Sequence, residues 1–171
     1  KIAELGGKAV TLSGPDGYIY DPEGIITEEK IDYLLEMRSS GRDKVQDYAD
    51  KFGVPFFAGE KPWGVKADVL MPCATQNEVG IKEAEMIVKN GVKYYVEVSN
   101  MPSTNEAVAY LRANGVVVAP SKAVNAGGVA VSGLEMSQNS MRYSWSSEEV
   151  DAKLKVIMKN IFENSIKAAN E

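Results

Sequence analysis

The segment GVVVAPSKAVNAGGVAVSG, residues 115–133, joins a run of β-branched residues to a stretch of small side chains. The run at residues 115–120 is short, apolar and closed by a proline, which is typical of a buried strand in a parallel sheet. The small residues that follow lead into a helix expected to reach about residue 143. A buried strand that passes directly into a helix is the repeating element of α/β folds.

The same alternation continues on the N-terminal side of this segment. Short apolar strands are expected at residues 8–12, 54–57, 68–74 and 93–100. Helices are expected from Thr27 to about residue 38 and at residues 43–52, 82–89, 103–113 and 146–169. This order predicts a doubly wound α/β domain with a mostly parallel sheet and helices on both faces. Residues 1–7 and the last helix look cut from something longer, so residues 1–171 are expected to be one domain truncated at both ends.

Composition excludes several classes of function. The net charge is −5, so no basic surface is expected to bind nucleic acid. No run of about 18 apolar residues suggests a membrane-spanning helix. Cys73 is the only cysteine, which favours a reducing, cytoplasmic setting, and we interpret it as a small apolar filler at a strand end. The chain has no histidine, so serine and cysteine triads and the usual zinc sites are not expected, and no metal site is predicted.

Small and polar residues follow the expected strands. Ligands of open α/β sheets bind beyond the C-terminal ends of the strands, so these residues predict a binding site at that edge. In chain order they are Ser13, Pro15 and Asp16, then Ala74, Thr75, Gln76 and Asn77, then Ser99 and Asn100, then Ser121, Lys122 and Asn125.

Asp16 allows two interpretations. If a further strand precedes Lys1, Asp16 follows the second strand of a dinucleotide-binding unit, where an acid accepts a hydrogen bond from the adenosine ribose 2′-OH. A carboxylate there would repel a 2′-phosphate and would favour NAD over NADP. Alternatively, residues 13–17 form a simple β-turn, since proline and Asp-Gly pairs serve turns well.

Asn100 and Asn125 each carry a donor and an acceptor, which suits a carboxamide or an α-amino acid. Asparagine is equally favoured at helix starts, so helix capping is the alternative for both. Residues 122–133 match neither a Walker loop nor a GxGxxG turn, and the valines among them argue against a solvated linker. Small residues at this place, Gly127 and Gly128 among them, would let a flat ring approach the backbone closely.

Six segments together resemble the glutamate dehydrogenase family, in particular the nucleotide-binding domain of its bacterial hexameric type. They are TLSGPDGYIYDPEGI (11–25), KVQDYADKFGV (44–54), KPWG (61–64), MPCATQNE (71–78), SNMPST (99–104) and APSKAVNAGGVAVSGLEMSQNS (119–140). The resemblance covers essentially the whole chain. It implies a Rossmann-like fold and the oxidative deamination of L-glutamate to 2-oxoglutarate and ammonia, with hydride transfer to NAD or NADP.

The resemblance also implies roles for single residues. Pro15 and Asp16 would meet the adenosine ribose and set coenzyme preference, with NAD expected over NADP. Ala74 and Thr75 would line the nicotinamide ribose, and Asn100 would contact the nicotinamide end. Family members commonly have alanine or glycine where Ser99 stands. The expected coenzyme-binding set is Ser13, Pro15, Asp16, Ala74, Thr75, Gln76, Asn100 and Asn125.

On the substrate side, Asn125 resembles the residue that touches both the coenzyme and the α-carbon end of the amino acid. Ser132 resembles the hydroxyl that holds the γ-carboxylate, with Val129 packed beside it. A hydroxyl rejects an apolar side chain because it would lose its buried partner, so a dicarboxylic substrate is expected rather than leucine, valine or phenylalanine.

The catalytic lysine and aspartate of the family lie in its other domain. This chain is therefore expected to supply no catalytic residue and to be inactive alone, as part of a homohexameric parent enzyme. Two alternatives stay open: another amino-acid dehydrogenase, of the leucine, phenylalanine or valine type, and a non-catalytic dinucleotide-binding module.

Overall fold

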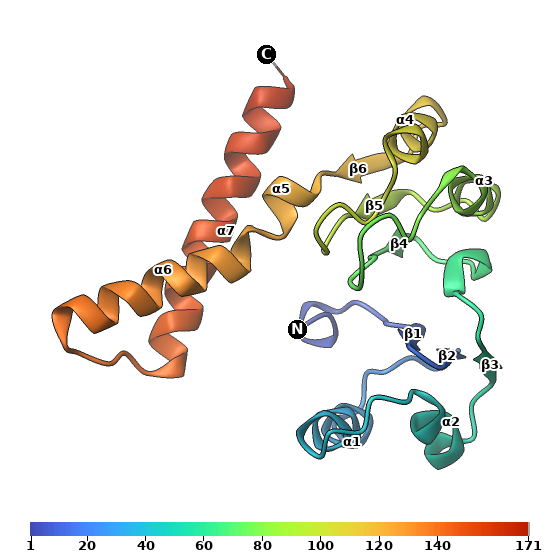
Figure 1. Cartoon of the computed structure of the whole chain (residues 1–171), viewed down its shortest axis with the longest axis horizontal. Helices are drawn as coiled ribbons and strands as arrows, with labels where there is room; N and C mark the ends of the chain where they lie inside the picture. The colour runs from blue at the N-terminus through green and yellow to red at the C-terminus, as the bar shows by residue number, and fades with distance from the viewer. Residues whose placement is uncertain (171) are drawn as a thin grey trace. The chain divides into compact units, whose positions relative to one another are not determined.

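The computed structural model of the chain describes residues 1–170 and divides into two compact units, Lys1–Ala67 and Asp68–Glu171. Each unit contains one three-stranded sheet, and the sheets are accompanied by helices (Figure 1). The expected α/β class is therefore confirmed.

The sheet of the first unit is antiparallel, in the order β1-β2-β3. A loop of two residues, Pro15 and Asp16, joins β1 directly to β2, with Gly14 paired to Gly17. Such a short loop can connect only antiparallel strands, so the expectation of parallel pairing was wrong here. The elements are the 3-10 turn η1 (Ala3–Leu5), β1 (Thr11–Gly14), β2 (Gly17–Tyr20), α1 (Glu28–Ser39), α2 (Gln46–Phe52), β3 (Phe56–Ala58) and the 3-10 turn η2 (Pro62–Gly64).

The core of the first unit lies where β2 meets its two helices. Its buried members are Ile19, Ile25, Met37, Val45, Tyr48 and Ala49. Burying such side chains contributes about 1.5–3 kcal/mol for each large apolar residue. Thr27 caps α1, as expected, by accepting a hydrogen bond from the amide of Lys30 at 3.4 Å. Gly53 ends α2 in the left-handed conformation that its sequence position predicts.

One carboxylate is buried in this core. Asp21 is 1% exposed and pairs with the Lys30 ammonium at 2.6 Å. The Tyr48 hydroxyl donates to the same carboxylate at 2.8 Å. Burial opposes ionisation of Asp21, but the hydrogen bonds from Lys30 and Tyr48 outweigh it and lower the pKa of this carboxyl below its usual value. Burial and the bond to Asp21 raise the pKa of Tyr48.

The sheet of the second unit is parallel, in the order β4-β5-β6, as the strand and helix pattern predicts. The strands are connected by crossover helices that pack against each other, each followed by a left-handed glycine. The elements are β4 (Val69–Leu70), α3 (Ile81–Lys89), β5 (Tyr94–Val96), α4 (Asn105–Ala113) and β6 (Val117–Ala119).

Three consecutive helices follow β6: α5 (Ser121–Val124), α6 (Ala126–Met141) and α7 (Ser147–Ala169). The last two pack against each other (Figure 1). Among the residues that the structure describes, neither α6 nor α7 buries a side chain fully. Within the same residues, no helix combines the length and apolar character that crossing a membrane would require.

Candidate functional site

The loops that follow β4 and β5 run side by side at the C-terminal edge of the parallel sheet. The Ser99 amide donates to the Pro72 carbonyl at 3.0 Å. Further along, the Asn77 amide donates to the carbonyl of Met101 at 2.9 Å, and a parallel bridge joins Val79 to Ser103. The structure thus brings the loop with Ala74, Thr75 and Gln76 together with the loop that carries Asn100.

The predicted site residues of these loops are available to a ligand. Thr75, Gln76 and Asn100 are exposed, as is Ala74. Capping does not explain Asn100, because the hydroxyl of Thr104 caps α4 by accepting from the Ala107 amide at 3.3 Å. Capping is therefore wrong as the alternative role for Asn100.

Asn125 lies at the junction of α5 and α6, and its side chain makes no capping hydrogen bond. Val129 and Ser132 follow it at i+4 and i+7, so the three residues lie along one side of α6. Val129 is 77% exposed, and the hydroxyl of Ser132 donates only to the Gly128 carbonyl, at 3.3 Å.

Two glycines of α6 face open space. A side chain added at Gly128 or Gly133 would meet nothing within 4 Å, whereas one at Gly127 would meet Met158 and Leu154 of α7. Packing within the described residues therefore explains only part of the need for a small residue at position 127. It does not explain the small residues at positions 128 and 133.

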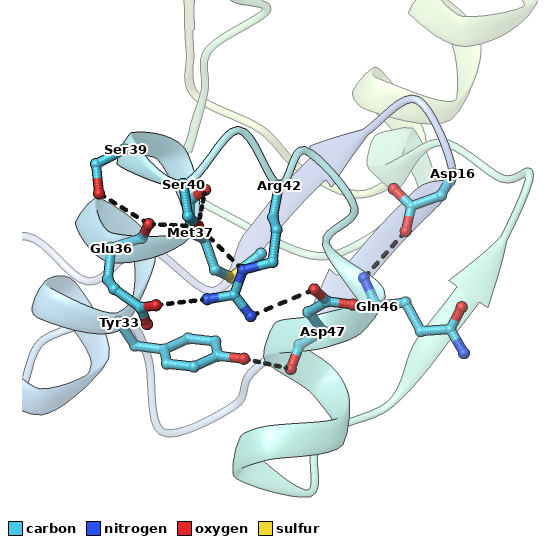
Figure 2. A network of polar contacts seen from close by, with 9 residues as sticks. All are labelled: Asp16, Tyr33, Glu36, Met37, Ser39, Ser40, Arg42, Gln46 and Asp47. Atoms are coloured by element: carbon cyan, nitrogen blue, oxygen red, sulfur yellow. Dashed lines mark hydrogen bonds and ion pairs between the residues drawn. The ribbon is translucent and has the colours of Figure 1, made fainter.

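Asp16 occupies the tip of the β1-β2 hairpin, so the β-turn interpretation of this segment is correct. Its carboxylate accepts from the amide of Val45 at 3.1 Å. It also accepts from the amide of Gln46 at 3.0 Å (Figure 2). Asp16 follows β1, which pairs antiparallel with β2, and its role at the adenosine ribose stays a prediction. Ser13 and Pro15, both exposed, belong to the same unit, and the other predicted site residues belong to the second unit.

The segment that Asp16 holds also lines a pocket of about 190 Å³, formed by Arg42, Asp43, Lys44 and Asp47. The Arg42 guanidinium pairs with Glu36 at 2.9 Å and Asp47 at 3.7 Å, and it lies 5.7 Å from the ring centre of Tyr33 (Figure 2). The sequence did not predict this pocket, because residues 38–42 were expected to break one helix and residues 43–52 to form the next.

Two acidic residues near the sheet edge were also missed. Glu97 is buried, and its carboxylate accepts from the Ser121 amide at 3.2 Å. Glu78 buries one carboxylate oxygen without a partner among the described residues. In sequence, neither acid differs from an ordinary exposed position.

Cys73 is exposed at the start of the loop after β4, so its interpretation as an apolar filler was wrong. Its thiol donates to the Met71 carbonyl at 3.3 Å. Loss of hydration around the sulfur, followed by the nearby charge of Glu78, raises the pKa of this thiol.

Known proteins resemble this chain over nearly its full length. It is 70% identical over 170 residues to the NAD-specific glutamate dehydrogenase of Clostridium symbiosum, covering 99% of this chain and 38% of that protein. A solved glutamate dehydrogenase structure superposes with a TM-score of 0.92 at 69% identity, over 99% of this chain and 38% of the other. For the Plasmodium falciparum glutamate dehydrogenase the TM-score is 0.89 at 42% identity, over 98% and 37%.

The chain spans about 38% of the length of the relatives it matches most fully. The family model for glutamate, leucine, phenylalanine and valine dehydrogenases matches residues 1–171. The chain belongs to the glutamate/leucine/phenylalanine/valine dehydrogenase family.

Proposed function

We propose that this chain is the coenzyme-binding part of a glutamate dehydrogenase, which oxidises L-glutamate to 2-oxoglutarate and ammonia and transfers hydride to a nicotinamide dinucleotide. The observation that carries the proposal is the 70% identity to an NAD-specific glutamate dehydrogenase across 99% of the chain. At such identity over a whole segment, the substrate class of the relative is the best guide to this chain.

The proposed coenzyme-binding residues are assigned in two groups, one to each half of the dinucleotide. Ser13, Pro15 and Asp16 would meet the adenosine half of the dinucleotide, and Ala74, Thr75, Gln76, Asn100 and Asn125 would meet its nicotinamide half. The exposure of Ala74, Thr75, Gln76 and Asn100 at the edge of a parallel sheet supports this assignment, since dinucleotides bind beyond the C-terminal ends of such strands. When bound, the coenzyme accepts the hydride.

The proposed coenzyme is NAD rather than NADP. Asp16 places a negative charge at the hairpin tip, and a 2′-phosphate near it would be repelled. The nearby cation Arg42 is already paired with Glu36 and Asp47, so it is poorly placed to offset that repulsion. Relatives named NAD-specific, NADP-specific and NAD(P)-specific all match the chain, so the preference rests on these charges.

The proposed substrate contacts lie on α6. Asn125 would contact the α-carbon end of the amino acid, and Ser132 would hold its γ-carboxylate beside Val129. The open space at Gly128 and Gly133 supports a ligand on this helix, because no packing within the described residues uses it. The parent enzyme is proposed to be a cytoplasmic homohexamer, and its catalytic lysine and aspartate to lie in the part of the relatives that this chain does not match.

Substrate profiling of the enzyme that contains this chain tests the proposal. Initial rates with L-glutamate are expected to exceed those with leucine, phenylalanine and valine, because the Ser132 hydroxyl would lose its partner against an apolar side chain. Rates with NAD are expected to exceed those with NADP. A preference for leucine, phenylalanine or valine would instead support the other amino-acid dehydrogenases of the family.

A further inference from the structure

The loops after β4 and β5 hold two residues in an unusual backbone conformation. Asn77 and Met101 have φ values of 53° and 49°, in the left-handed region that favours glycine. The Asn77 amide donates to the Met101 carbonyl at 2.9 Å, so the two unusual residues meet directly. Backbone strain of this kind persists only where surrounding contacts hold it, and it gathers at ligand sites.

The same two loops contain the unpaired buried oxygens of the described residues. They are Glu78 Oε1, on the residue after Asn77, and Ser99 Oγ, whose residue is tied by its amide to Pro72. A buried oxygen without a partner has lost its bonds to water and gained none in return. Ser103 on the second loop is different, because its hydroxyl shares a 2.7 Å hydrogen bond with the buried Tyr95.

These features surround the exposed residues Thr75, Gln76 and Asn100, to which the nicotinamide half of the coenzyme is assigned above. Backbone strain and unpaired oxygens raise the free energy of the loops when no ligand is bound. A ligand that relieves the strain and pairs the oxygens therefore binds more tightly.

We propose that Glu78 and Ser99 are positioning residues for the nicotinamide end of the dinucleotide, whose binding shifts the paired loops so that both oxygens gain the hydrogen bonds they lack in the free chain. The nicotinamide carboxamide and its ribose offer N–H and O–H donors, which a carboxylate and a hydroxyl can accept. The inference rests on the proposed coenzyme site.

A test compares Ser99→Ala with Ser103→Ala in the 171-residue chain. Removing the unpaired Ser99 hydroxyl is expected to leave the melting temperature unchanged or raised, whereas removing the paired Ser103 hydroxyl is expected to lower it. NMR titrations then follow binding of NADH and of ADP-ribose, which lacks the nicotinamide. Ser99→Ala and Glu78→Gln are expected to weaken NADH binding about tenfold and to leave ADP-ribose binding unchanged, and Ser99→Thr, which keeps the hydroxyl, is expected to restore NADH binding.

Any result that differs from these expectations overturns the inference. Unchanged NADH affinity in Ser99→Ala and Glu78→Gln would show that the two oxygens do not serve the ligand. An equal loss of ADP-ribose affinity, or a lowered melting temperature of Ser99→Ala, would indicate a purely structural role. If the unsubstituted chain binds neither compound, the coenzyme site proposed above is itself wrong, and the inference falls with it.

Discussion

At the scale of single residues, two carboxylates organise the first unit in different ways. Asp21 is buried and satisfied by Lys30, Tyr48 and the amides of residues 23 and 24. Asp16 lies at a hairpin tip and accepts from two backbone amides about thirty positions further along the chain. Each carboxylate thereby joins a strand or its turn to a helical segment that is distant in sequence.

Replacing Asp21 by asparagine is expected to destabilise the first unit by about 3 kcal/mol at neutral pH, because Lys30 would be left partly buried without its counter-charge. Unfolding in urea, followed by the fluorescence of Trp63 in a Trp145→Phe background, measures this loss, since Trp63 is buried in the first unit. Asp32→Asn, at an exposed position of α1, is the matched control and is expected to cost less than about 0.5 kcal/mol. Equal losses in the two variants would contradict the role of Asp21.

The lowered pKa of Asp21 also makes the stability of the first unit depend on pH. The pKa of Asp21 is lower in the folded chain than in the unfolded chain. At acidic pH the folded chain therefore binds fewer protons at Asp21 than the unfolded chain does. The stabilisation is therefore complete above the unfolded value, about 3.9, and is lost as the pH falls through the lower folded value. Urea unfolding between pH 6 and pH 2 should show a steeper loss in the unsubstituted chain than in Asp21→Asn. Parallel curves would refute this assignment.

Replacing Asp16 by serine removes the charge at the hairpin tip but keeps a hydrogen-bond acceptor for the amides of Val45 and Gln46. If Asp16 excludes a 2′-phosphate, the ratio of NADPH to NADH affinity should rise about tenfold, which corresponds to about 1.4 kcal/mol. Fluorescence titrations with the two coenzymes measure the ratio. Asp50→Ser, at an exposed position of α2, controls for the lost charge, and the same rise in that variant would contradict a local effect of Asp16.

At the scale of elements, α7 depends on local interactions more than on burial. Its half-buried face packs on α6, yet none of its described residues is fully buried. The hydroxyl of Ser146 accepts from the Glu149 amide at 3.3 Å, and the Glu149 carboxylate accepts from the Ser146 amide at 2.8 Å. This reciprocal capping box satisfies two amides that the helix itself leaves free.

Replacing Ser146 by alanine is expected to weaken the first turn of α7 by about 1 kcal/mol, because one of those amides loses its acceptor. Hydrogen exchange of the amides of residues 148–150 measures the change, which should appear as about fivefold faster exchange. Ser137→Ala is the matched control, since that hydroxyl donates only to the carbonyl of Gly133 in its own helix. Exchange that is no faster in Ser146→Ala than in the control would show that the cap is dispensable.

At the scale of the whole molecule, the chain consists of two units that each possess a sheet of their own. The candidate ligand residues lie at a hairpin tip in one unit and at strand ends and on α6 in the other. The assigned roles are contacts with a coenzyme and an amino acid. No residue among them is proposed to exchange protons with the substrate.

The purified 171-residue chain is therefore expected to show no glutamate dehydrogenase turnover, while still binding nucleotide. An assay of NADH formation with saturating L-glutamate, run beside a full-length family member, measures this. ADP-ribose binding by NMR serves as the control that the chain is folded. Turnover above the background of a Ser132→Ala variant would contradict the prediction that catalysis needs residues from the part of the relatives that this chain does not match.

Much of the fold was predictable wherever local patterns decide it. The parallel order of β4, β5 and β6 follows from short apolar runs alternating with helices, and the caps Thr27, Thr104 and Ser146 stand at helix starts that the sequence indicates. The residues after β4 and β5 were predicted to share one edge, because parallel strands place their C-terminal ends together. Family membership also followed from sequence segments alone and was confirmed by the comparisons.

The sequence by itself thus determined the α/β class, the parallel sheet of the second unit and the family. Only the tertiary structure decided that Thr11–Gly14 pairs antiparallel with Gly17–Tyr20. It also decided that the Asp16 carboxylate accepts hydrogen bonds from the amides of Val45 and Gln46. The exposure of Cys73 and the unpaired oxygens of Glu78 and Ser99 were likewise decided by the tertiary structure. The reason is physical: helix caps and strand periodicity act over a few residues, whereas these contacts depend on which distant segments meet when the chain packs.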